Sequence, residues 1–193
     1  MAKPQVQTKA TKQTKSAPAP QTKKAASKPS SDGFVDDDYE EPSGPSNYMS
    51  LEKGDNKFRC LSKPVMGWQE WVEKKPLRYR EDEKPEESAD PENPLKFFWA
   101  IKVFDYADNQ VKLLLITQAS VRKAILSLSK DSDWGTPLGY DLKVTRTGDN
   151  LQTKYTVTPS PKKPLSKEMV NADRAKPCNI EAIFEGEDAF KAE

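Results

Sequence analysis

The sequence contains no histidine and only two cysteines, Cys60 and Cys178, among its 193 residues. A structural zinc site takes four ligands, nearly always cysteine and histidine, so this composition argues against one. The lack of histidine also removes the commonest general base and every Ser-His or Cys-His nucleophile pair. We therefore expect a protein that is not an enzyme and that holds no metal or cofactor.

Long apolar runs are absent as well. No stretch approaches the roughly 18 apolar residues of a membrane span, and the N-terminus lacks the apolar segment of a secretory signal. Hydrophobic residues make up 35% of the chain and charged residues 32%, which is too polar for a chain that is globular throughout. We expect a cytoplasmic protein whose core is concentrated in one region of the chain.

Charge is unevenly distributed and predicts two tails. Residues 1–31 carry seven lysines and no acid, and residues 32–41 carry six acids and no base. Without apolar periodicity, residues 1–47 are predicted to be disordered, and the aspartates 36–38 in them lack any scaffold that would preorganise a metal site. Residues 165–193 hold seven acids against four bases and predict a flexible acidic tail. The structured domain is therefore expected to span residues 48–164.

Within that domain the apolar pattern predicts five strands and one helix. The strands are expected at 57–61 (resuming around Trp68 and Trp71), 95–106, 111–118, 140–147 and 153–159. Residues 120–131 have helical periodicity, with Thr117 or Ser120 as the expected cap, and the proline-rich residues 73–94 predict a long loop. This order predicts a mainly β chain with a single OB-fold five-stranded barrel, one helix between the third and fourth strands, and disordered tails on either side.

The segment KFFWAIKVFDY, residues 96–106, holds five aromatic residues in eleven positions. Side chains on a strand alternate between its two faces. One face is wholly apolar and predicts core: Leu95, Phe97, Trp99, Ile101 and Val103. The other face alternates aromatic and basic residues: Lys96, Phe98, Ala100, Lys102, Phe104 and Tyr106. Such a face suits single-stranded nucleic acid, whose bases stack on aromatic rings and whose phosphates attract cations. The alternative is that Phe98 and Phe104 pack beneath the long loop or a tail.

Basic and aromatic residues elsewhere in the domain are candidates for the same surface. Trp68 and Trp71 are either stacking platforms or a lid on the barrel end, and the acidic residues 81–92 either cover the surface or are plain solvated loop. The complete set of predicted nucleic-acid-binding residues is Lys57, Arg59, Trp68, Trp71, Lys74, Arg78, Tyr79, Arg80, Phe98, Lys102, Phe104, Tyr106, Lys143 and Arg146.

Several blocks in consistent order resemble phage single-stranded DNA-binding replication proteins of the OB-fold type. They are GDNKFRCLSKPVMGWQEWV, KFFWAIKVFDY, LLITQASVRKAI, WGTPLGYDLKVTRTGDN and TKYTVTPSPKKP, within about residues 48–164. The resemblance implies an OB-fold protein that coats single-stranded DNA during replication, recombination and repair in the infected bacterial cytoplasm. By position it implies binding through Arg59, Trp68, Trp71, Phe98, Lys102 and Tyr106. The structural zinc of some relatives is not implied, since the ligands are missing here.

The resemblance also implies that the acidic end recruits replication or recombination proteins and competes with DNA. The lysines of residues 1–31 suggest added affinity for DNA, or self-association of neighbouring copies on it. Two other function classes fit the same residues. One is an RNA-binding OB or cold-shock-like module, because stacking does not distinguish ribose from deoxyribose. The other is a protein-interaction adaptor whose aromatic face receives a peptide.

Overall fold

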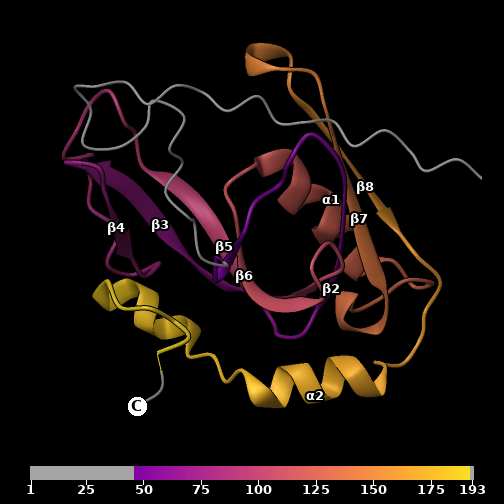
Figure 1. The fold of residues 1–193 in the computed structure, drawn as a ribbon. Coiled ribbons are helices and arrows are strands. Elements are labelled where there is room, and N and C mark those ends of the chain that lie inside the picture. The colour runs from indigo at the N-terminus through magenta and orange to yellow at the C-terminus, as the bar shows by residue number, and fades with distance from the viewer. Residues whose placement is uncertain (1–45, 192–193) are drawn as a thin grey trace, which may run out of the picture. The chain divides into compact units, whose positions relative to one another are not determined.

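The computed structural model describes residues 46–191, so the basic residues 1–31 and the acidic residues 32–41 of the predicted tail lie outside the described residues. Its strands are β1 (Tyr48–Met49), β2 (Gly54–Cys60), β3 (Val65–Val72), β4 (Lys75–Tyr79), β5 (Lys96–Asp105), β6 (Gln110–Ile116), β7 (Asp141–Thr147) and β8 (Lys154–Pro159). The helices are α1 (Ala119–Lys130) and α2 (Lys167–Ala175), with 3₁₀ turns η1 (Pro137–Gly139), η2 (Asn150–Gln152) and η3 (Ile180–Glu185) (Figure 1).

All five predicted strands and the predicted helix are present within a few residues of their expected ends. The predicted first strand corresponds to β2 and β3, which both pair antiparallel with β5 and together follow most of its length. β5 also pairs with β6, and β7 pairs with both β2 and β8. The predicted order of strands along the chain is therefore confirmed.

The strands form an open sheet rather than the predicted five-stranded barrel. Hydrogen-bonded neighbours follow the order β1-β6-β5-β2-β7-β8, with β3 and β4 attached to β5. The short strand β1 runs parallel to the outer edge of β6, and no pairing joins β8 to β6 in the stretch of chain that is described. The structure establishes a mainly β domain, and the OB-fold barrel is not confirmed.

The main core lies between the sheet and α1. Phe58, Ile101 and Leu142 from three adjacent strands are almost completely buried there, together with Val121 and Ile125 of α1. These helix positions are four residues apart, so one stripe of α1 faces the strands. Neither expected cap residue begins the helix, because Gln118 occupies the cap position and makes no side-chain hydrogen bond there.

The loop predicted over residues 73–94 begins later than expected, because β3 and β4 form a hairpin. Only Glu73 and Lys74 separate the two strands, and both have positive φ values, 50° and 65°. Two left-handed residues are what a tight hairpin with a type I′ turn requires, and Asn-Gly is the usual pair. Glu-Lys is not such a signal, which is why the sequence did not predict the hairpin.

Residues 165–191 are folded against the sheet, contrary to the flexible tail predicted for residues 165–193. Ser166 caps α2 by accepting a hydrogen bond from the backbone N–H of Met169. Figure 1 shows α2 and η3 (orange to yellow) along the same side of the sheet. Met169, Ile183 and Ala189 are buried in clusters with residues of β5 and β6, so this C-terminal segment contributes to the hydrophobic core.

Candidate nucleic-acid interface

The two faces of β5 were predicted to differ, and the structure confirms the core face only. Trp99, Ile101 and Val103 are buried in the main core, and Phe97 packs against it. On the other face Phe98 is 0% exposed and Phe104 is 2% exposed. The prediction that these two rings are open for base stacking is therefore wrong for this conformation, and the alternative that they pack beneath a tail is the one observed.

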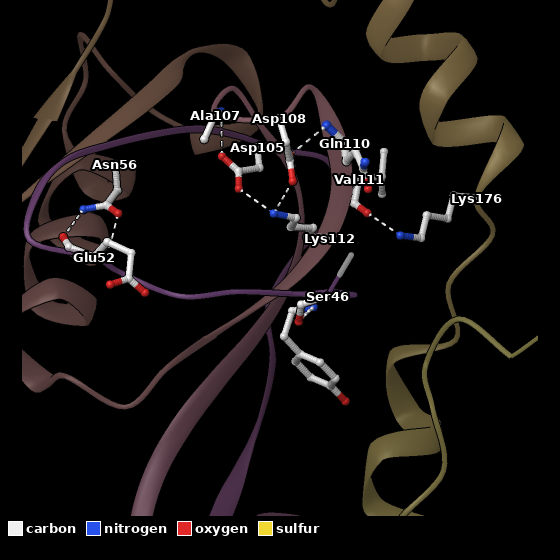
Figure 2. Close-up of polar contacts among 11 residues, drawn as sticks. Ser46, Glu52, Asn56, Asp105, Ala107, Asp108, Gln110, Val111, Lys112 and Lys176 are labelled. Carbon is white, nitrogen blue, oxygen red and sulfur yellow. Dashed lines mark hydrogen bonds and ion pairs between the residues drawn. The ribbon is translucent and has the colours of Figure 1, made fainter. Parts of the chain in front are cut away.

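The C-terminal segment covers that face through apolar and polar contacts together. The Phe184 ring lies 6.0 Å from the Phe98 ring, centroid to centroid. Lys102, another predicted DNA contact, pairs with Asp173 of α2 at 2.7 Å. Lys176 donates a 2.9 Å hydrogen bond to the carbonyl of Val111, a contact drawn in Figure 2. Lys102 therefore holds α2 in place and is not available to a phosphate.

Arg59 is also buried, with 1% of its surface exposed, although it alternates along β2 with the core residues Phe58 and Cys60 and so lies on the opposite face. Its guanidinium donates to the Asp141 carboxylate at 3.2 Å, and to the carbonyls of Leu138 and Lys163 at 2.9 and 2.7 Å. Every partner belongs to the protein itself. Arg59 therefore joins β2 to the η1 region and the segment after β8, and its predicted role at phosphates is not supported.

Asp141 is the centre of a charged cluster that includes two further predicted residues. Its carboxylate accepts a 2.9 Å hydrogen bond from the Tyr106 hydroxyl, and it pairs with Lys163 at 2.9 Å and Lys57 at 3.4 Å. Burial would raise the pKa of the Asp141 carboxyl, but hydrogen bonds from Lys163, Tyr106 and Arg59 hold it below its ordinary value. Burial and the bond to Asp141 raise the pKa of Tyr106. The Asp141 carboxylate is therefore ionised at neutral pH, and its hydrogen-bond and ion-pair partners come from the domain itself.

The remaining predicted residues of β7 are also paired within the domain. Lys143 lies 3.2 Å from the Asp55 carboxylate, and Arg146 donates a 3.0 Å hydrogen bond to the carbonyl of Leu51. Asp55 is fixed as well, because it accepts a 2.6 Å hydrogen bond from Thr145. This region of the sheet is therefore mixed in charge, which makes it a weak attractor for phosphates.

A cavity beside the predicted residues Lys57 and Tyr106 has the wrong charge for an anion. It has a volume of about 590 Å³ and lies between the ends of β1, β2 and the β5–β6 turn, where Glu52, Asp55 and Asp105 line it. Figure 2 shows Lys112 in this region, directed at Asp105 and Asp108, and both carboxylates form ion pairs with it. A phosphate placed there would meet more carboxylates than free cations.

The hairpin of β3 and β4 carries most of the other predicted residues and separates the two tryptophans. Strand alternation puts Trp68 on the face of Phe97 and Trp71 on the face of Phe98. Trp71 is 44% exposed, whereas Trp68 is half-buried. Lys74 lies exposed in the hairpin turn, and Arg78 is half-buried on the Trp71 face of β4.

Tyr79 and Arg80 have partners within the domain. Tyr79 donates its hydroxyl to Glu70 at 2.7 Å. Arg80 pairs with Glu185 of η3 at 3.2 Å, and its guanidinium lies 4.9 Å from the centroid of the Phe184 ring. Tyr79 therefore joins the two strands of the hairpin, and Arg80 holds η3 against it.

Four half-exposed or exposed residues form a connected cluster on the Trp68 face, which we call the arm cluster: Arg122, Phe97, Trp68 and Lys84. The Arg122 guanidinium lies 5.3 Å from the Phe97 ring centroid, the Phe97 and Trp68 rings meet edge to face at 5.2 Å, and Lys84 Nζ lies 4.4 Å above Trp68. Within residues 46–191 neither Lys84 nor Arg122 pairs with a carboxylate. Arg122 donates hydrogen bonds to the carbonyls of Ile116 and Thr117, which fix its position without neutralising its charge. The cluster thus alternates aromatic surface with positive charge that no described carboxylate neutralises.

Sequence reasoning identified only Trp68 of these four. Phe97 was assigned to the core, Lys84 stands alone among the acids of residues 81–92, and Arg122 lies on the predicted helix beside the apolar stripe. The pairing of Trp68 with Phe97 across β3 and β5 brings the two rings together, and this register could not be read from sequence. The signal that was available is the basic pair Arg122-Lys123 at the start of α1.

The loop between β4 and β5 is fixed beside the arm cluster by Glu70. The buried Glu70 carboxylate accepts hydrogen bonds from the Ser88 hydroxyl at 2.6 Å, the Tyr79 hydroxyl at 2.7 Å and the Ala89 N–H at 2.8 Å. The bonds from Ser88 and Tyr79 hold the pKa of Glu70 below its ordinary value. Glu70 lies on the same face of β3 as Trp68, so this anchor determines where Lys84 and its acidic neighbours lie.

Comparison with protein-family models, curated proteins and solved structures finds no match. Among residues 46–191, neither helix has the length and apolar character needed to cross a membrane. Function is therefore inferred from the residues and their geometry.

Proposed function

We propose that this chain is a non-enzymatic single-stranded DNA-binding protein and that the strand lies on the arm cluster. The observation that carries the proposal is the connected row of Arg122, Phe97, Trp68 and Lys84, with aromatic rings accessible to solvent and cations that no described carboxylate neutralises. Base–aromatic stacking contributes about 1–3 kcal/mol per base, and cations beside the rings attract the phosphates. The proposal moves the site from the covered face of β5 to the opposite face of the β3–β5 pair.

The position of Lys84 gives the proposal a defined first step. Its ammonium lies on the Trp68 ring, where a cation–aromatic contact contributes about 0.5–1 kcal/mol at an exposed site. A stacked base contributes more, so it replaces Lys84, which then turns to a phosphate. The seven acids of residues 81–92 repel phosphates from that side, so the strand passes on the α1 side, near Arg122.

The cellular role follows from this activity and from the resemblance described above. A protein of this kind coats single strands in the cytoplasm during phage DNA replication, recombination and repair. The C-terminal segment is the proposed contact for replication or recombination proteins, and the lysines of residues 1–31 are the proposed contacts for self-association on DNA.

A fluorescence titration tests the proposal. Tryptophan emission should be quenched by a thymidine oligonucleotide, and much less by a duplex of equal length, whose base faces are hidden. Higher salt should weaken the binding, because neutralised phosphates release counterions. A matched RNA oligonucleotide distinguishes the RNA-binding alternative, which requires equal or tighter binding to RNA. Absence of binding to any single strand at low salt would contradict the proposal and favour the adaptor.

A further inference from the structure

A second feature of the same face is an open cavity of about 310 Å³ between α1, η1 and the β3–β5 pair. Its walls are mainly apolar and its rim is polar. The walls include Met66, Trp99, Ile101, Ile125, Leu126 and Leu138. The rim includes Ser62, Lys63, Ser129 and Thr136. This volume is at the lower end of the range for small-molecule sites, which are typically apolar with a few polar groups.

The cavity continues the row of side chains that forms the arm cluster. Met66 and Trp99 are paired across β3 and β5, just as Trp68 and Phe97 are, and each lies two positions further along the same strand face. On α1, Leu126 and Ser129 follow Arg122 by four and seven residues, which places them on the same side of the helix. A strand stacked on the arm cluster therefore reaches the cavity with its next base.

The chemistry of the cavity suits an uncharged flat ring. Cys60 contributes a thiol to the lining, and burial raises its pKa to about 12, so it stays neutral. Lys63 is exposed at the rim, where it can meet the phosphate of the same nucleotide. An apolar enclosure with one cation at its edge matches a base attached to its phosphate better than it matches an aliphatic chain or a free anion.

We infer that this cavity is a nucleobase subsite that takes one unstacked base of the bound strand, with a preference for pyrimidines. The inference rests on the proposed function and adds a specific position to it. Strand residues two apart are separated by about 6.6 Å, roughly twice the 3.4 Å between stacked bases. The base in the cavity must therefore leave its neighbour. Neighbouring bases of a thymidine strand stack weakly, so moving one base into the cavity costs little stacking free energy. Neighbouring bases of an adenosine strand stack strongly, so the same movement costs more.

The test fills the cavity from the helix and measures a ratio of affinities. Ser129→Phe places a ring in the cavity, and Ser129 makes only a hydrogen bond to the carbonyl of Leu126 on its own helix. Ser127→Phe is the matched control, because residue 127 is exposed on the same helix and does not line the cavity. Each variant and the unmodified full chain are titrated with thymidine and adenosine oligonucleotides of equal length.

We expect the unmodified chain and Ser127→Phe to prefer thymidine by about threefold or more. Ser129→Phe should lose about tenfold in thymidine affinity and about threefold in adenosine affinity, which brings the ratio close to one. The ratio is informative even if a variant is partly unfolded, because unfolding lowers both affinities equally. An unchanged ratio in Ser129→Phe, with binding intact, would overturn the subsite and leave the proposed function standing. Absence of binding by the unmodified chain would overturn both.

Discussion

At the scale of single residues, Arg59 shows why strand alternation can predict the correct face and the wrong exposure. Alternation puts Arg59 on the outer face of β2, and it does lie on that face, opposite Asp141 in the β2–β7 register. Alternation does not predict that Tyr106, Lys163 and the chain around Leu138 cover this part of the outer face and exclude solvent from Arg59. A charged residue can be fully buried when it is paired, and the pairing depends on tertiary structure.

Asp141→Asn should destabilise the domain strongly. It leaves the buried Arg59 guanidinium without a counter-charge, a change that typically costs about 3–5 kcal/mol of the free energy of unfolding. Urea denaturation followed by circular dichroism measures it. Asp55→Asn is the control, because that carboxylate is exposed and its loss should matter little. Equal stability of the two variants would show that the Asp141 cluster does not hold the domain together.

Glu70 gives a prediction with a defined pH dependence. Its folded pKa is lowered, so its contribution to stability is present above the ordinary glutamate pKa of about 4.3 and is lost as the pH falls through the folded pKa. Glu70→Gln should therefore be less stable than the unmodified chain at pH 7, with residues 80–95 more open to proteolysis. The difference should narrow below about pH 4.

Thermal unfolding at a series of pH values measures this difference, and limited proteolysis reports on the loop. Glu73→Gln is the control, since residue 73 lies exposed in the hairpin turn. A Glu70→Gln difference that stays constant between pH 7 and pH 3 would show that the carboxylate does not anchor the loop.

The C-terminal segment departs most from expectation at the scale of elements. Its composition is acidic, yet Ser166 begins a helix and Met169, Ile183, Phe184 and Ala189 supply an apolar side. The apolar residues are too widely spaced for one helical period, because they belong to a helix, a 3₁₀ turn and an extended end. Composition therefore predicted a tail, and only the complementary face of β5 and β6 shows why the segment folds.

Gly67→Ala should loosen η3. A methyl group at residue 67 would lie 2.5 Å from the carbonyl oxygen of Tyr79 and 2.6 Å from the Phe184 ring, and the Tyr79 backbone cannot easily give way. Overpacking of this kind typically costs about 1–3 kcal/mol. We expect a lower melting temperature and faster proteolysis of residues 176–191.

Gly139→Ala is the matched control for this change, because nothing lies within 4 Å of an added methyl group there. If both variants melt and are cleaved alike, the close packing of η3 on β3 does not contribute to stability.

At the scale of the whole domain, the order of strands and helix along the chain was predicted correctly, whereas the predicted barrel was not found. The strands and helix were found from alternation and helical periodicity, since these depend on local sequence alone. Barrel closure depends on which strand lies beside β6, and the two-residue strand β1 occupies that place. A segment so short leaves no pattern in the sequence.

The residue types of the candidate site were predicted from the sequence, but the face of the sheet on which it lies was not. An aromatic and basic surface was expected and one exists, but it lies on the Trp68 face because the C-terminal segment covers the Phe98 face. Trp68 and Trp71 were treated together on account of their spacing. Strand alternation separates them, and this separation makes the central claim testable.

The most direct measurement compares Trp68→Leu with Trp71→Leu in binding a fluorescently labelled thymidine oligonucleotide, by anisotropy at fixed salt. The two residues lie on opposite faces of β3, and circular dichroism checks that both variants fold. We expect Trp68→Leu to weaken binding by about tenfold, the value of one stacked base, and Trp71→Leu to bind like the unmodified chain. Loss of affinity in Trp71→Leu alone, or no effect of either change, would contradict a binding site on the arm cluster.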